Sequence, residues 1–203
     1  MANYRTSRII PVVLVVVIII IAIAALVSLA RVVFFSGSNT DNSAQVDVSR
    51  DALLNTSAGH RVTMTVRGPI VADEEFHSYE IAISPDSRTI NTYTGYLDTV
   101  VSHETLGNNI SSYEEFVHAL DKAELAKGDQ FKGDKNDTRG ICATGSVYQF
   151  GIYDGTTEVK NLWTSTCSGS KGSLDASVKQ LTDLFVSQLP SADTLIKKIK
   201  LAS

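Results

Sequence analysis

The sequence predicts an α+β protein, in which one N-terminal transmembrane helix precedes an antiparallel β-sheet domain with helices packed on one face. Three observations predict this fold. The N-terminal region contains a single long, uncharged apolar run. Beyond it, several short segments alternate apolar and polar residues, as half-buried strands do. Later segments repeat apolar residues at helical spacing, and strands grouped around helices favour an antiparallel sheet covered by helices.

The apolar run spans residues 9–30 without a charged side chain. As a helix rising about 1.5 Å per residue it reaches about 33 Å, enough to cross a hydrocarbon core of about 30 Å. Residues 32–35 continue the apolar character beyond Arg31, whose side chain can extend to the membrane interface. The sequence therefore predicts that residues 9–35 span the lipid bilayer once.

The orientation of this segment follows from the basic residues around it. Arg5 and Arg8 precede the run, and only Arg31 follows it closely. The positive-inside rule therefore places residues 1–8 in the cytoplasm. We expect a single-pass protein of the cell membrane whose C-terminal domain is extracytoplasmic.

A cleaved signal peptide is the alternative interpretation. Ser28 and Ala30 are small residues at the two positions that a cleavage after Ala30 requires. A cleavable apolar core is usually about 7–15 residues long, however, which is shorter than the run seen here. Both interpretations place the domain outside the cytoplasm.

A change in amino-acid composition divides the rest of the chain into a linker and a domain. Residues 36–45 are rich in Ser, Asn, Gly, Thr and Asp, which indicates a flexible linker over residues 36–48 before a domain at 49–203. The chain has a net charge of −4, and the part beyond residue 35 holds 15 basic and 22 acidic side chains. An acidic domain repels polyphosphate, so we expect no nucleic-acid partner.

In the first half of the domain the sequence predicts one short helix followed by strands. Ser49 can cap a helix over residues 49–55. Alternation of apolar and polar residues predicts strands at 61–66, 76–83 and 89–96, with a further short strand at 97–103. A turn with Pro85 at its second position connects the second and third of these strands.

Helices are predicted at three further places. Ser112 and Glu115 form a capping-box pattern at the start of a helix over residues 111–127, which Gly128 ends. An amphipathic stripe predicts a second helix over 174–189, and a last short helix is expected over 193–200. The lysines in the last helix suit the dipole at its C-terminus, and contact with a membrane surface is a second interpretation.

A hairpin around Asp154-Gly155 leads to a disulfide prediction. If these two residues form the loop between the β-rich runs 141–153 and 156–167, Cys142 lies directly opposite Cys167. Counting from the turn makes them a non-hydrogen-bonded pair, the closer kind, so a bridge can form. We predict a structural disulfide at the open end of the hairpin, which requires an oxidising compartment and agrees with the predicted orientation. A redox-active pair is the alternative, although the sequence has no Cys-x-x-Cys motif.

The same register predicts which side chains share a face. It places the two cysteines with the apolar residues Tyr148, Phe150, Ile152, Val159 and Trp163. The opposite face then carries Gln149, Glu158 and Lys160.

No catalytic, cofactor-binding or metal-ligating residues are predicted. Asp134, Asn136 and Thr138 resemble the first half of a calcium loop, but Arg139 stands where such a loop needs Gly. Ser168-x-x-Lys171 matches the serine–lysine pattern of penicillin-recognising enzymes, yet the companion Ser-Asp-Asn is absent. The four histidines have no neighbours at metal-binding spacing.

Three short segments resemble a known group of proteins. They are Thr65-Val-Arg-Gly-Pro-Ile70, Tyr93-Thr-Gly-Tyr96, and Trp163-Thr-Ser-Thr-Cys167 with Lys171-Gly172, behind a basic N-terminus and a Val/Ile-rich helix. Together they resemble uncharacterised membrane-anchored proteins of the Saccharibacteria type. The resemblance implies a bacterial cell-surface location and brings no activity or site residues.

Two function classes remain. The first is a non-catalytic binding or envelope-structural domain whose partner is another envelope protein or a small ligand. The second is a cell-envelope enzyme, either a hydrolase or thiol-dependent, with an unrecognised site. A pocket in which a Ser or Cys is hydrogen-bonded to a histidine would favour the second class.

Overall fold

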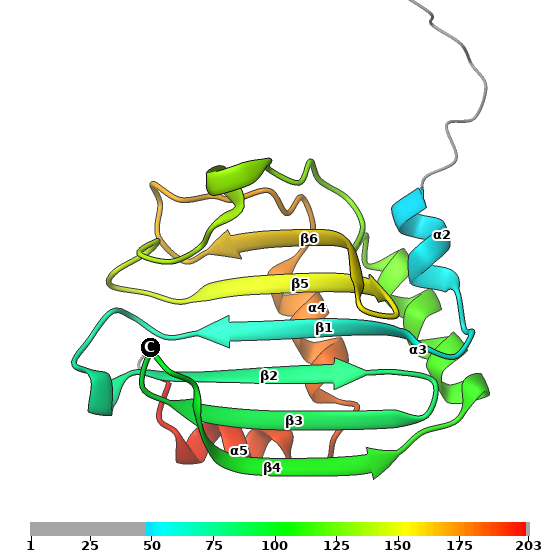
Figure 1. The fold of residues 1–203 in the computed structure, drawn as a ribbon, viewed down its shortest axis with the longest axis horizontal. Helices are drawn as coiled ribbons and strands as arrows, with labels where there is room; N and C mark the ends of the chain where they lie inside the picture. The colour runs from blue at the N-terminus through cyan, green and yellow to red at the C-terminus, as the bar shows by residue number, and fades with distance from the viewer. Residues whose placement is uncertain (1–47, 202–203) are drawn as a thin grey trace, which may run out of the picture. The chain divides into compact units, whose positions relative to one another are not determined.

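The computed structural model describes residues 48–201, which form a six-stranded antiparallel sheet with helices packed against it (Figure 1). The α+β class predicted from the sequence is therefore confirmed for this part of the chain. The predicted transmembrane segment and nearly all of the predicted linker lie outside the described residues. Between residues 48 and 201, no helix is both long and apolar enough to cross a membrane.

The strands lie in the order β4-β3-β2-β1-β5-β6. Their bounds are His60–Arg67 (β1), His77–Ile83 (β2), Ser87–Thr94 (β3), Thr99–Gly107 (β4), Val147–Asp154 (β5) and Thr157–Ser165 (β6). The four strands predicted in the first half of the domain are confirmed, with ends that differ by a few residues. Strand β1 is central because it pairs with both β2 and β5, which are far apart in the sequence.

Side-chain alternation makes one face of this sheet apolar. Met64 on β1 pairs with Ile81 on β2 and with Phe150 on β5, and all three side chains are almost fully buried. Val62 and its partners form the next apolar row. The buried rows create the main core.

Helices cover this apolar face. They are α2 (Val48–Leu54), α3 (Ile110–Lys122), α4 (Val178–Val186) and α5 (Ala192–Lys198), with short 3-10 helices η2 (Asp73–Glu75) and η3 (Gly133–Asn136) in the connections. Figure 1 shows α4 crossing behind the central strands. The fully buried Phe185 of α4 contacts Phe116 of α3 and Phe150 of β5, with ring centroids 5.3 and 6.0 Å apart. Burying three aromatic rings at one point joins two helices to the sheet.

Helix α3 begins and ends differently from the prediction. Asn109 is its N-cap, and the Asn109 side chain accepts a hydrogen bond from the backbone of Ser112. The predicted capping box, with Ser112 as the cap, is therefore wrong. The helix ends at Lys122 rather than at residue 127, since Glu124 adopts a left-handed conformation with φ of 62°.

The predicted register of the last hairpin is also wrong. Strand pairing continues to Asp154 and Thr157, so the loop is Gly155-Thr156 rather than Asp154-Gly155. A bulge after Ile152 shifts the register once more. As a result Leu162 lies opposite Phe150 in the main core, while Trp163 lies opposite Gln149 on the other face.

The disulfide itself is confirmed, although its predicted cross-strand geometry is not. Cys142 and Cys167 are bonded with their Cα atoms 5.4 Å apart, but both lie beyond the ends of β5 and β6. They meet because the chain turns back after Cys142, where the Gly145 amide donates a hydrogen bond to the Cys142 carbonyl. Together with Val147 and Trp163, Cys142 forms a small second core.

The bridge closes a separation of 25 residues, so its loss frees considerable chain entropy in the unfolded state. We expect the double variant Cys142→Ala/Cys167→Ala to lose roughly 3 kcal/mol of unfolding free energy. Chemical denaturation measures the loss of unfolding free energy. As a control, the wild type denatured in the presence of a reductant, which breaks the same bridge, should show the same loss. Identical denaturation midpoints with and without the bridge would contradict this expectation.

Candidate functional site

The face of the sheet opposite the helices is polar and carries the candidate site. Strand pairing aligns Gln149, Thr65, Glu80 and Asn91 in one row across four neighbouring strands. The next row contains Arg67, Ser78 and Tyr93. Charged and amide side chains therefore stand side by side where the helices do not reach.

One end of this face is hollowed to a volume of about 350 Å³, and we name this feature the open-face hollow. Its floor consists of strand residues from the two rows, namely Thr65, Arg67, Ser78, Glu80, Tyr93 and Gln149. Its walls come from the connections, namely Phe76, Tyr96, Asp98 and Arg139. The volume lies at the lower end of the range usual for small-molecule sites, about 300–1,000 Å³.

An aromatic wall closes one side of the hollow. The rings of Phe76 and Tyr96 are stacked with centroids 4.2 Å apart. The Tyr96 hydroxyl donates to the Val71 carbonyl at 2.7 Å, and the Tyr96 amide donates to the Asp73 carboxylate at 2.8 Å. These contacts hold the Tyr96 side chain and backbone in place, so they fix the position of the aromatic wall.

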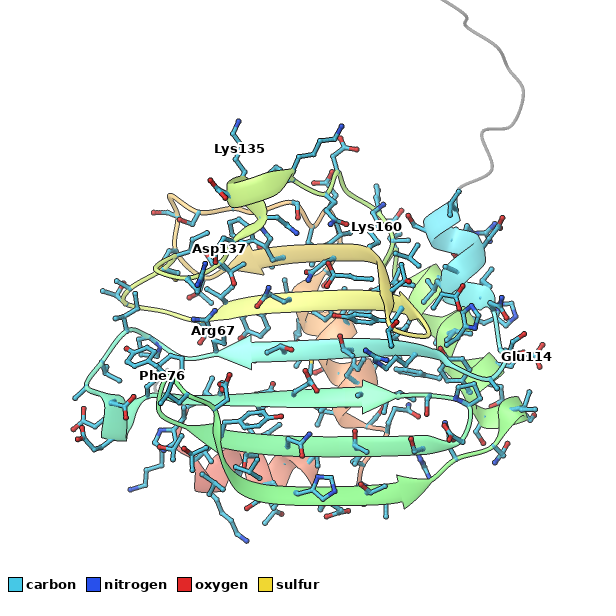
Figure 2. The ribbon with its side chains drawn as sticks, viewed as in Figure 1. Arg67, Phe76, Glu114, Lys135, Asp137 and Lys160 are labelled. Atoms are coloured by element: carbon cyan, nitrogen blue, oxygen red, sulfur yellow. A yellow bond between two sulfur atoms is a disulfide. The ribbon has the colours of Figure 1, made fainter. Side chains whose placement is uncertain are left out.

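Arg67 stands at the side of the hollow near the loop that precedes β5. Its guanidinium lies 5.9 Å from the Phe76 ring centroid and donates a hydrogen bond to the buried Thr138 hydroxyl at 3.3 Å. Figure 2 shows Arg67 between Phe76 and the loop that carries Asp137. These contacts orient the guanidinium across the sheet toward the loop.

Arg139 brings a second guanidinium to the same side. Its Nε donates to the Asp137 carboxylate at 2.9 Å, and this contact lowers the pKa of Asp137 to about 2. Arg139 is therefore held by an acidic partner on its own loop, and it lines the hollow as part of an Arg–Asp pair.

The other side of the hollow, which contains Glu80 and Tyr93, is acidic, in contrast to the side that contains the two arginines. Burial raises the pKa of the Glu80 carboxyl, and repulsion by Asp98 adds to that rise, while the Thr65 hydroxyl and Arg61 oppose it. Burial also raises the pKa of Tyr93, with further contributions from Glu80 and Asp98. Two carboxylates and a phenol therefore share one corner, and none of the ion pairs within residues 48–201 includes either carboxylate.

Ser78 lies on the floor between the two charged sides. It is only 3% exposed and still lines the hollow. Its hydroxyl forms no hydrogen bond with any other residue of the described part of the chain. The Ser78 oxygen is not among the fully enclosed polar atoms without a partner in residues 48–201, so it is open to the hollow and available to a ligand.

A histidine network lies beside the hollow on the edge strand β4. The His103 ring bonds the Asn91 side chain through Nδ1 at 2.5 Å and the Thr105 hydroxyl through Nε2 at 2.9 Å. Both His103 and Thr105 are exposed and neither lines the hollow. The network joins β3 to β4 on the sheet surface, and the serine in the hollow does not take part in it.

The residues singled out in the sequence lie elsewhere or have other roles. The two cysteines are joined to each other and do not line the hollow. Thr138, which continues the calcium-like pattern, instead accepts the hydrogen bond from Arg67. Within residues 48–201, no three His, Cys, Asp or Glu side chains gather closely enough to hold a metal ion.

Sequence reasoning missed the residues that make the hollow. Two of the segments that carry the family resemblance, 65–70 and 93–96, do supply lining residues, but the resemblance assigned them no role. The available signal was the presence of charged residues, Arg67 and Glu80, on the polar side of two neighbouring strands. Comparison with known families and proteins adds nothing further, since no family model and no curated protein matches the chain.

The raised pKa of Glu80 predicts a specific dependence of stability on pH. The folded chain binds the Glu80 proton more tightly than the unfolded chain, so stability falls as pH rises above the ordinary value of 4.5. We expect Glu80→Gln to be more stable than the wild type at about pH 7 and to lose this advantage at about pH 3.5, where Glu80 is protonated in both states.

Urea unfolding at the two pH values measures the difference. Glu114→Gln is the matched control, because Glu114 is an exposed residue of helix α3 far from the hollow (Figure 2). A Glu80→Gln variant that is less stable than the wild type at about pH 7 would contradict the expectation.

Proposed function

We propose that this chain is a membrane-anchored extracytoplasmic binding protein and that the open-face hollow holds a small polar ligand. The observation that carries the proposal is the presence of unpaired polar groups in the lining of the hollow. Glu80 and Asp98 have no ion-pair partner among residues 48–201, and the Ser78 hydroxyl has no hydrogen-bond partner there.

Such a lining lowers stability in the absence of a ligand. Partial burial of the Glu80 carboxylate without an ion-pair partner is unfavourable, and its hydrogen bond from the Thr65 hydroxyl at 3.5 Å offsets this cost only in part. Local conflicts of this kind concentrate at functional sites, where binding a ligand compensates them. A non-catalytic role is favoured because Ser78 has no histidine partner and both cysteines are in a disulfide.

Three observations support the proposed location. The Cys142–Cys167 bridge is typical of oxidising compartments outside the cytoplasm. Residues 9–35 have the length and composition of a bilayer anchor, and Arg5 and Arg8 favour a cytoplasmic N-terminus. The resemblance to membrane-anchored proteins of the Saccharibacteria type implies the same placement. In this location the lipid bilayer and a second envelope protein are the partners we propose beside the ligand.

The binding role is tested by screening the full-length protein in detergent against amino acids, short peptides, saccharides and nucleotides. Ligands found by thermal shift should lose their effect in Tyr93→Ala, because Tyr93 lines the hollow. They should keep it in Tyr153→Ala, which alters a tyrosine on the same face outside the hollow. If no class binds, or if every hit ignores Tyr93, the hollow is not a binding site.

The location is tested by labelling engineered cysteines in intact cells with a membrane-impermeant maleimide. The wild type has no free cysteine and provides the unlabelled baseline. We expect Lys135→Cys, at an exposed position of η3 (Figure 2), to react in intact cells. Ala2→Cys should react only after permeabilisation, and the opposite pattern would refute the proposed orientation.

A further inference from the structure

We infer that the open-face hollow recognises a zwitterionic ligand of the size of a dipeptide. The ligand's ammonium group lies against Glu80, Asp98 and Tyr93, and its carboxylate lies against Arg67. This inference rests on the proposed function and specifies the chemical class of its ligand.

The acidic corner is suited to an ammonium group. Glu80 and Asp98 repel each other across the corner, and a cation placed between them removes that repulsion. Tyr93 is close enough to feel both carboxylates, and its ring can add a cation–π contact to a bound ammonium. A carboxylate or phosphate group placed there would meet two like charges.

The opposite side is suited to a carboxylate. A guanidinium has five N–H donors, and Arg67 uses one nitrogen for the Thr138 hydroxyl. Its remaining donors can bind a carboxylate in the forked geometry that arginine favours. Arg139 adds positive charge on the same side, although its guanidinium already donates hydrogen bonds to the Asp137 carboxylate.

The spacing of the two sides selects the length of the ligand. Arg67 pairs with Ser78 and Thr65 pairs with Glu80, so Arg67 and Glu80 are diagonal neighbours on adjacent strands. The backbone positions of diagonal neighbours are about 7–8 Å apart, and the Arg67 guanidinium is directed toward the Thr138 hydroxyl. A single amino acid spans only about 3.3–3.6 Å and is too short to contact both charged groups, so a dipeptide is the shortest peptide that fits.

The floor between the charges is suited to a peptide group. The unpartnered Ser78 hydroxyl lies directly opposite Arg67 and two residues from Glu80 on the same strand. It offers a donor and an acceptor to the central amide of a bound dipeptide, while Gln149, on the far side of β1, lines the floor beyond Arg67. A purely apolar linker between the two charged ends would leave these groups unpaired.

The test is isothermal titration of the full-length protein in detergent with alanylalanine. Its N-acetylated form, which lacks the ammonium, and its C-amidated form, which lacks the carboxylate, should each bind at least tenfold more weakly. Alanine and tetra-alanine, also zwitterions, should bind more weakly as well, which separates a free amino acid and a longer peptide from the dipeptide.

Pairs of a test variant and a control variant show which residues bind the ammonium and the carboxylate of the ligand. Glu80→Gln should weaken alanylalanine binding at least tenfold while leaving the already weak N-acetylated form unchanged. Glu158→Gln, on the same face outside the hollow, should have no effect. Arg67→Gln should likewise weaken binding, whereas Lys135→Gln, which removes an exposed positive charge outside the hollow, should not. Unchanged circular dichroism establishes that each variant is folded.

Distinct results overturn the inference and the proposed function. If both blocked forms bind as well as alanylalanine, or if the Glu80 and Arg67 variants retain wild-type affinity, the zwitterion inference is wrong. In that case a saccharide or nucleotide that binds only when Tyr93 is present would leave the binding role intact. If alanylalanine does not bind and no other ligand class depends on Tyr93, both are wrong.

Discussion

The pairing of β1 with both β2 and β5 is the constraint on which the rest of the structure depends. It places residues 60–67 between two strands from distant parts of the sequence and fixes which side chains share a face. Alternate residues then become apolar on one side and polar on the other. The apolar side requires helices to exclude water, and Phe185 of α4 joins that layer to the sheet. The polar side, left without a helical layer, becomes the surface on which the hollow forms.

The disulfide acts on the hollow although it does not line it. The loop between α3 and β5 supplies Thr138 and Arg139 to the site, and Cys142 closes the end of that loop against the end of β6. The Ala143 carbonyl also accepts a hydrogen bond from the Ile70 amide, which joins this loop to the connection after β1. One covalent bond therefore limits the motion of the loop that orients the guanidinium of Arg67.

Local patterns predicted the elements well because strand alternation and helical spacing are properties of short segments. The register of the last hairpin could not be predicted in the same way. It depends on a turn at Gly155-Thr156 and on a bulge after Ile152, and neither has an unambiguous sequence signal. The cysteine prediction was right because the two residues flank the open end of the hairpin under either register. The hollow was missed because Arg67, Glu80 and Gln149 become neighbours only through the long-range pairing of β1 with β5 and through loop contacts.

The separation of Arg67 from Glu80 is what distinguishes the hollow from an ordinary polar surface. Oppositely charged diagonal neighbours on a sheet commonly form a surface ion pair, which contributes about 0–1 kcal/mol and neutralises both charges. Here the Phe76 ring and the Thr138 hydroxyl hold the guanidinium toward the loop. Glu80 remains with Asp98 and Tyr93, where burial raises its pKa. The fold thus keeps two opposite charges apart over a floor with an unpaired hydroxyl, which is why we propose a ligand that carries both charges.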